Sequence, residues 1–210
     1  MKKSEGKLTD AEILCRKCVK ILEKVYGKEH LRVATHLTNL GLILREQKRV
    51  HEAFQVFHRA LEIRERVLGP DHPCVATSLN NVGLILKIQG KYEEVESYYR
   101  RCVDIREKVQ GEDHPDLATS LSNLAGLLQH ERRYPEAESI YKRAVGILEK
   151  ALGPQHPHVA NVLNNLGVLQ NDLGDQEGAQ CSLTRALHIR SGLAWWSHAS
   201  SVECSGSGAE

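Results

Sequence analysis

Apolar residues recur along this chain at intervals of three and four, a spacing that places their side chains on one face of an α-helix. Between residues 73 and 89 the pattern is carried by Val75, Ala76, Leu79, Val82, Gly83 and Leu86. The pair Gly90-Lys91 interrupts it. A second helical run then follows through Val95, Tyr98, Tyr99, Cys102, Val103 and Ile105. The pattern therefore predicts two helices joined by a short turn.

This helical pair recurs every 42 residues. The period is marked by the glycines Gly27, Gly69, Gly111 and Gly153 and by the histidines His30, His72, His114 and His156. A fixed period of this length is typical of solenoid proteins, in which each helical pair buries its apolar face only against its neighbours. The sequence therefore predicts an all-α stack of repeats and not a closed globular domain.

We name the first helix of each pair the A helix and the second the B helix. The A helices are expected near residues 31–47, 73–89, 115–131 and 157–173. The B helices are expected near residues 50–67, 92–109, 134–151 and 176–190. The chain thus contains four complete pairs, and residues 7–27 match a B helix alone.

The linkers between pairs contain residues that end one helix and start the next. Gly69 can adopt the left-handed conformation that ends a helix, and Pro73 suits the first turn of the next helix. His72 falls near the N-cap between them. We therefore predict that the repeated histidines cap helices and do not bind metal.

The helical pair has a signature of its own. In the A helix it reads Leu37-x2-Leu40-Gly41-x2-Leu44, and in the B helix Ala53-x3-Phe57-x2-Ala60. This pattern resembles the tetratricopeptide repeat, with Leu where many members have Trp. The 42-residue form, with Leu-Asn-Asn-Val-Gly and Gly-Pro-Asp-His-Pro, is similar to the repeats of kinesin light chains and nephrocystin-type arrays. The resemblance implies a right-handed α-solenoid.

The predicted layout has a short lead at residues 1–6, a solenoid at 7–190 and a divergent tail at 191–210. Within the solenoid, the half-repeat at 7–27 precedes full repeats near 31–68, 73–110, 115–152 and 157–190. Because the half-repeat lacks its A helix, we expect exposed apolar patches and self-association through the uncapped ends. The tail reads as disordered, and its Trp195-Trp196 pair with Glu203 could fold back onto a binding surface.

Two cysteines, Cys15 and Cys18, form a CxxC sequence in the half-repeat. In the repeat frame Cys15 aligns with Phe57, and Cys18 aligns with Ala60. Both of these are predicted core positions, and no second cysteine pair accompanies them. We therefore expect Cys15 and Cys18 to be packing residues, with no metal or redox role.

Composition and charge narrow the function. The 210 residues include 28 Lys and Arg against 27 Asp and Glu, so the net charge is +1. This balance argues against nucleic-acid binding through a basic surface, and the A helices carry no Phe, Tyr or Trp on which bases could stack. The chain shows neither an apolar signal-peptide core nor a membrane-length apolar run. We expect a cytoplasmic protein that binds neither nucleic acid nor membrane.

No set of residues suggests catalysis. The sequence offers no Gly-rich phosphate loop after a strand and no convergent Ser/His/Asp or Cys/His group. We therefore expect no enzymatic activity, no cofactor and no metal.

The informative residues are asparagines inside the predicted A helices. They are Asn39, Asn80, Asn81, Asn123, Asn164 and Asn165. Asparagine costs roughly 0.5–0.7 kcal/mol relative to alanine within a helix, so a compensating interaction is expected. Either these side chains bond to neighbouring helices and order the stack, or they bind the backbone of an extended peptide, since each amide both donates and accepts.

The resemblance to tetratricopeptide arrays places these A-helix positions in a concave groove that contacts peptide ligands. Thr77 lies one turn before Asn81 on the same face, and Arg45 and Lys87 lie one turn after the asparagines. The two cations favour a peptide with acidic residues. We thus predict a protein-interaction scaffold. The alternative is a structural spacer or oligomerisation segment of a larger signalling protein, with no peptide ligand.

Overall fold

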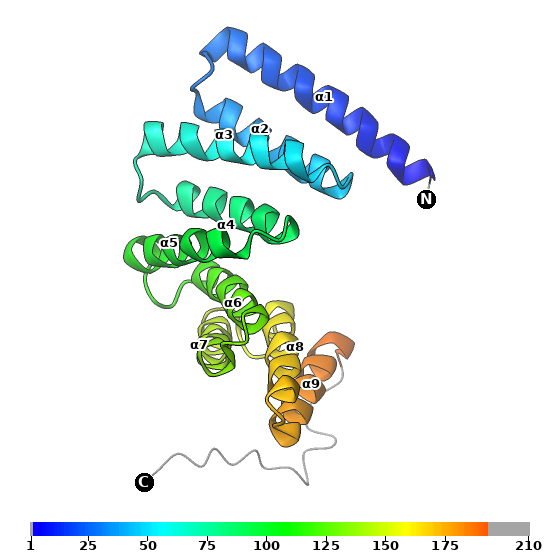
Figure 1. Cartoon of the computed structure of the whole chain (residues 1–210), viewed down its shortest axis with the longest axis vertical. Coiled ribbons are helices and arrows are strands. Elements are labelled where there is room, and N and C mark those ends of the chain that lie inside the picture. The colour runs from blue at the N-terminus through cyan, green and yellow to red at the C-terminus, as the bar shows by residue number, and fades with distance from the viewer. Residues whose placement is uncertain (1, 193–210) are drawn as a thin grey trace. The chain divides into compact units, whose positions relative to one another are not determined.

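The structure is a computed structural model that describes residues 2–192, and all regular elements in that range are helices (Figure 1). They are α1 (Lys2–Tyr26), α2 (Leu31–Glu46), α3 (Val50–Leu68), α4 (Pro73–Ile88), α5 (Tyr92–Gln110), α6 (Pro115–His130), α7 (Tyr134–Leu152), α8 (Pro157–Asp172) and α9 (Gln176–Ser191). The predicted all-α repeat fold is confirmed. Each predicted A and B helix starts at the expected residue and ends within one residue of it.

The N-terminal end of the chain differs from the expected layout, and most of the predicted tail is not described. Helix α1 begins at Lys2 and so includes residues 2–6 of the predicted lead, in spite of the low helix propensity of Gly6. Of the predicted tail, residues 193–210 lie outside the described residues, and with them Trp195, Trp196 and Glu203.

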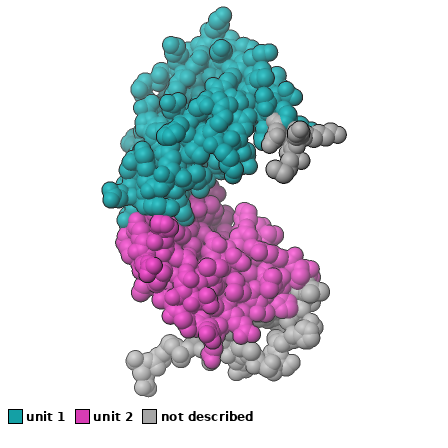
Figure 2. Space-filling view, turned by 45° about the vertical axis from the view of Figure 1, so that its right-hand side comes forward, with its two compact units in different colours: residues 1–111 teal, residues 112–210 magenta. Residues whose placement is uncertain are grey.

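The chain divides into two compact units, residues 1–111 and residues 112–210 (Figure 2). In unit 1, each of the helices α1 to α4 packs against the next one along the chain. In unit 2, α6 packs on α7, α7 on α8 and α8 on α9. Even-numbered helices are A helices and odd-numbered helices are B helices, so each unit is a stack of helical pairs.

The predicted caps are present at all four A helices. The Nδ1 atom of each capping histidine accepts a hydrogen bond from the backbone N–H two residues later. These bonds are 3.1 Å at His30 and His72 and 3.2 Å at His114 and His156. Each cap satisfies an N–H group that the helix itself leaves unpaired. The capping role of the repeated histidines is therefore confirmed.

Close packing between the A and B helices depends on a small residue in the A helix. A Cβ atom built on Gly83 would lie 2.5 Å from Cε1 of Tyr99, whose side chain is fully buried. Gly41 faces Phe57 in the same way, and in the third pair Ala125 and Tyr141 occupy the two positions. The missing or small side chain lets each B-helix ring lie against the A-helix backbone.

The prediction that Cys15 and Cys18 are core residues is wrong. Cys18 is exposed and Cys15 is half-buried, whereas their equivalents Ala60 and Phe57 are buried. The difference arises because Phe57 and Ala60 lie under α2, the A helix of their own pair. Helix α1 has no such partner among the described residues.

Candidate peptide-binding surface

Each A helix has one face that is buried and one that is open to solvent. In α4 the buried face comprises Val75, Ala76, Ser78, Leu79, Val82, Gly83, Ile85 and Leu86. The open face carries Thr77, Asn80, Asn81, Leu84 and Lys87, which are exposed or half-buried. Four of these residues were predicted from the sequence, and Leu84 lies among them. All five share one stripe of the helix, because each lies three or four residues from another member of the set.

Unit 1 holds two such stripes, on α2 and α4, and α3 packs against both helices. Asn39 on α2 is exposed, and Asn81 on α4 is half-buried. Neither side chain makes a hydrogen bond to any residue that the structure describes. Asn80 is half-buried and has a partner within the chain. Thr77 is exposed, and its hydroxyl donates to the carbonyl of Pro73 at 3.4 Å.

The two predicted cations differ in their surroundings. Arg45 is half-buried, and its Nη2 donates to Oε1 of the neighbouring Glu46 at 2.9 Å. Lys87 is also half-buried, and this burial lowers the pKa of its ammonium because the charged form loses water. An acidic group placed beside Lys87 would favour the charged form again.

Unit 2 carries the remaining predicted residues on α6 and α8. Asn123 and Asn164 are half-buried and Asn165 is exposed. Asn123 has a partner within the chain, whereas Asn164 and Asn165 make no hydrogen bond to a described residue. Gln129, at the position of Lys87 in the repeat, donates to Oδ2 of Asp172 at 2.8 Å. The basic side chains of the predicted surface are therefore confined to unit 1.

Sequence reasoning missed an apolar component of these stripes. Leu42 on α2 is 37% exposed, and Val168 at the equivalent position of α8 is 46% exposed. Leu84, between Asn81 and Lys87, is half-buried. Each of these residues follows an asparagine of the stripe by three positions. This helical spacing could have predicted that they lie on the same face. The stripes thus combine amide groups with apolar side chains.

This arrangement suits recognition of a chain segment. Amide side chains can pair with a peptide backbone, and the leucines can contact an apolar side chain.

Among the residues that the structure describes, no group of three or more His, Cys, Asp or Glu side chains is placed to hold a metal ion. In the same range, every helix is either too short or too polar to span a bilayer.

Comparison with known proteins supports the repeat assignment. The Tetratricopeptide repeat family matches residues 2–55, 32–108, 80–144 and 116–191. A comparison with curated protein sequences gave no significant match.

Solved structures of similar fold include those of three other proteins. BtubC (BKLC) from P. vanneervenii has a TM-score of 0.80 at 23% identity, over 90% of this chain and 76% of that protein. The putative kinesin light chain repeats of Podosopora anserina give 0.73 at 22% identity, over 90% of each chain. The apo form of RapI gives 0.77 at 16% identity, over 90% of this chain and 66% of that one. At these identities the likeness concerns the fold.

Proposed function

The chain belongs to the tetratricopeptide repeat family, whose members are scaffolds for protein–protein interaction, and we propose that it binds an extended, acidic peptide on the A helices of unit 1. The binding surface is the pair of solvent-facing stripes on α2 and α4. In the kinesin light chains that the repeats resemble, the corresponding stripes line a concave groove. Binding involves no chemical step, since it uses only side-chain amides, cations and apolar contacts.

The observation that carries this proposal is that the side-chain amides of Asn39 and Asn81 make no hydrogen bond to a described residue. Each costs roughly 0.5–0.7 kcal/mol of helix propensity relative to alanine. Neither recovers that cost through a hydrogen bond to a described residue. A peptide backbone laid along the stripes would supply a donor and an acceptor to each amide. This supports a binding role over a packing role for these two positions.

The charge of the ligand follows from Arg45 and Lys87. Both cations lie on the stripes of unit 1, six residues after Asn39 and Asn81, and Leu42 and Leu84 lie between. A peptide with an apolar residue flanked by Asp or Glu would meet both kinds of group. Such a peptide would also offset the burial that disfavours the charged form of Lys87.

A panel of synthetic peptides tests the proposal. Fluorescently labelled dodecamers with a central leucine or tryptophan between acidic residues are titrated with the chain, alongside versions with lysine in place of each acid. We expect the Asn39→Ala/Asn81→Ala variant to bind the acidic peptides about tenfold more weakly, since two amide hydrogen bonds are lost. Gln55→Ala is the matched control, because Gln55 is an exposed amide on α3, away from the stripes.

The alternative function, a structural spacer or oligomerisation segment, makes the opposite prediction. In that case no acidic peptide binds in a saturable manner, or both variants bind as the native chain does.

Self-association, cytoplasmic location and the absence of nucleic-acid or membrane binding stay predictions. Light scattering at tens of micromolar chain would test the first of them.

A further inference from the structure

Helix α1 presents an apolar stripe that no described residue covers. Its side chains are Leu14, Cys18, Ile21 and Val25, which follow one another at intervals of four, three and four residues. Leu14 is 62% exposed and Ile21 is 59% exposed. The stripe runs along the side of α1 opposite to Glu12 and Val19, which are buried.

Comparison of α1 with the equivalent residues of the next B helix shows which kind of surface packs on this stripe. The equivalents of Cys18 and Ile21 in the next B helix are Ala60 and Ile63, both 1% exposed. They form a core cluster with residues of α2, the A helix of their own pair. Ile105 and Ile147 are buried at the same position in α5 and α7. Cys18 and Ile21 are therefore the B-helix half of an A–B packing surface, whereas Val25 lies outside it, because its equivalents Val67 and Val109 are 48% and 51% exposed.

A series of ion pairs between successive B helices indicates the charge of the partner. Arg59 on α3 donates to Glu23 on α1 at 2.5 Å, and Arg101 on α5 donates to Glu65 on α3 at 2.5 Å. In unit 2, Arg185 pairs with Glu149 in the same way. The equivalent of these arginines in α1 is Lys17, which is exposed and forms no ion pair with a described residue.

In α3 and α7, though not among the described residues of α5, an ion pair joins the end of the B helix to the linker before its own A helix. Arg66 pairs with Glu29 at 2.6 Å, and Lys150 pairs with Asp113. The equivalent residue in α1 is Lys24, which is also exposed and without an ion pair to any described residue. Both missing acids would come from one segment, because Glu23 and Glu29 lie six residues apart, just before α2.

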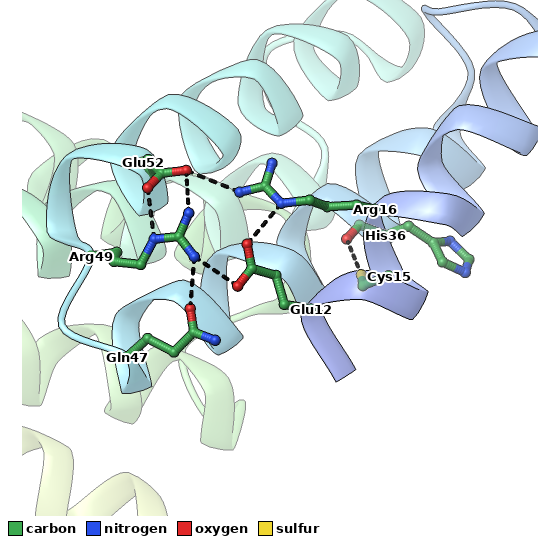
Figure 3. Close-up of polar contacts among 7 residues, drawn as sticks. All are labelled: Glu12, Cys15, Arg16, His36, Gln47, Arg49 and Glu52. Atoms are coloured by element: carbon green, nitrogen blue, oxygen red, sulfur yellow. Dashed lines mark hydrogen bonds and ion pairs between the residues drawn. The ribbon is translucent and has the colours of Figure 1, made fainter. Parts of the chain in front are cut away.

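Helix α1 is held firmly enough to present this face. The carboxylate of Glu12 accepts hydrogen bonds from Arg16 at 2.8 Å and from Arg49 at 2.7 Å (Figure 3). The two guanidinium groups also bind Glu52, so the network ties α1 to the start of α3. The open stripe is thus part of an ordered helix packed on unit 1.

We infer that this face docks a partner helix of defined chemistry: an A-type helix of a helical repeat, preceded by two acidic residues six positions apart. The apolar side of that helix covers Leu14, Cys18 and Ile21. The acids pair with Lys17 and Lys24, as Glu23 and Glu29 pair with Arg59 and Arg66. The site is separate from the peptide-binding surface on α2 and α4 and does not depend on it.

A second copy of this chain fits the face poorly. Each A helix of the described chain already packs against its own B helix. If the α1 helices of two copies packed on each other, Lys17 and Lys24 of one copy would face Lys17 and Lys24 of the other, and these like charges repel. The residue of α9 that corresponds to Glu23 is Ser191, so the last described repeat offers no acid to Lys17.

A peptide copied from this chain's third repeat is a suitable probe. Residues 107–130 contain Glu107 and Asp113 at the required spacing, followed by the A-helix sequence of α6. The labelled peptide is titrated with the full chain by fluorescence anisotropy. In parallel, alkylation of Cys18 is followed by mass spectrometry, with the exposed Cys74 as an internal reference.

We expect saturable binding that protects Cys18 and leaves Cys74 reactive. The Lys17→Glu/Lys24→Glu variant should bind about tenfold more weakly, and a peptide with Glu107→Lys and Asp113→Lys should restore its affinity. Lys20→Glu is the matched control, because Lys20 is an exposed lysine of α1 whose equivalents Glu62 and Asp104 are acidic. The Asn39→Ala/Asn81→Ala variant should bind this probe normally, which separates the two sites.

Four results would overturn the inference. The first is a lack of saturable binding. The second is an equal loss of affinity for Lys20→Glu, which would show that the peptide is attracted to lysine in general. The third is protection of Cys18 by a higher concentration of the chain alone, which would assign the face to a second copy. The fourth is protection of Cys18 by vesicles of phosphatidylserine and phosphatidylcholine and not by the peptide, which would assign the face to a lipid surface.

Discussion

At the scale of single residues, the histidine caps make the first prediction. His72→Ala removes the acceptor for the N–H of Cys74 and should lower the free energy of unfolding by about 1 kcal/mol. His72→Asp should retain most of the stability, since a carboxylate also caps a helix and interacts favourably with its N-terminus. Urea unfolding followed by circular dichroism measures both. An equal loss in His51→Ala, an exposed histidine on α3, would contradict a capping role.

The sequence was a good guide to residues whose role is local. The caps depend on neighbours two residues away, and the stripe of Asn39 and Asn81 depends only on helical spacing. It was a poor guide to Cys18, because burial there requires an A helix that the described chain lacks. It also missed the pairing of Arg66 with Glu29, since a contact across 37 residues follows only from the stacked register.

At the scale of the elements, the contact between Gly83 and Tyr99 makes the second prediction. Gly83→Val places new atoms against a buried ring and should lower the free energy of unfolding by about 2 kcal/mol. Gly146→Val is the control, because a Cβ on Gly146 meets no atom within 4 Å. Denaturant unfolding of the two variants should differ clearly. Equal stabilities would show that α4 and α5 can separate without cost.

The attachment of α1 makes the third prediction. Burial raises the pKa of Glu12, but hydrogen bonds from Arg16 and Arg49 outweigh it and hold that pKa below its usual value of 4.5. Such a carboxylate contributes stability above its unfolded pKa, and the contribution is lost as the pH falls through the folded one. At pH 7, Glu12→Gln should therefore lower the free energy of unfolding by about 1–2 kcal/mol.

The test of this third prediction is the pH dependence of the difference between the native chain and Glu12→Gln. Thermal unfolding should show a gap that is constant near neutrality and shrinks in acid, below about pH 4.5. Asp10→Asn serves as control, because Asp10 is an exposed acid of the same helix. A gap that persists unchanged in acid would mean that the carboxylate of Glu12 is not what holds α1 in place.

At the scale of the whole molecule, the 42-residue period was enough to predict the fold. Within each unit, the helical pairs pack on one another in the same way, so the pattern of one period describes all of them. The distribution of charge was harder to predict, since the ion pairs that neutralise it join different repeats. Within the described residues of the two units, the predicted stripes carry Arg45 and Lys87 in unit 1 and Gln129 and Asn171 in unit 2. The proposal of an acidic ligand therefore concerns the stripes of unit 1.

This difference makes the fourth prediction. Lys87→Glu should weaken binding of the acidic peptide about tenfold at low salt and less at about 0.5 M salt, where exposed charges are screened. Lys108→Glu, an exposed lysine on α5, should leave the affinity unchanged. Anisotropy titrations at several salt concentrations measure the effect. Equal losses for the two variants would point to net charge and not to a defined surface.

The central claim is that unit 1 binds a peptide along the A-helix stripes. The most direct measurement is a nitrogen–proton correlation spectrum of the isotope-labelled chain, recorded while the acidic peptide is added. We predict that the side-chain amide signals of Asn39 and Asn81 shift in a saturable manner and that the signal of Gln55 stays in place. Shifts confined to other residues, or no saturable shift at all, would contradict the claim.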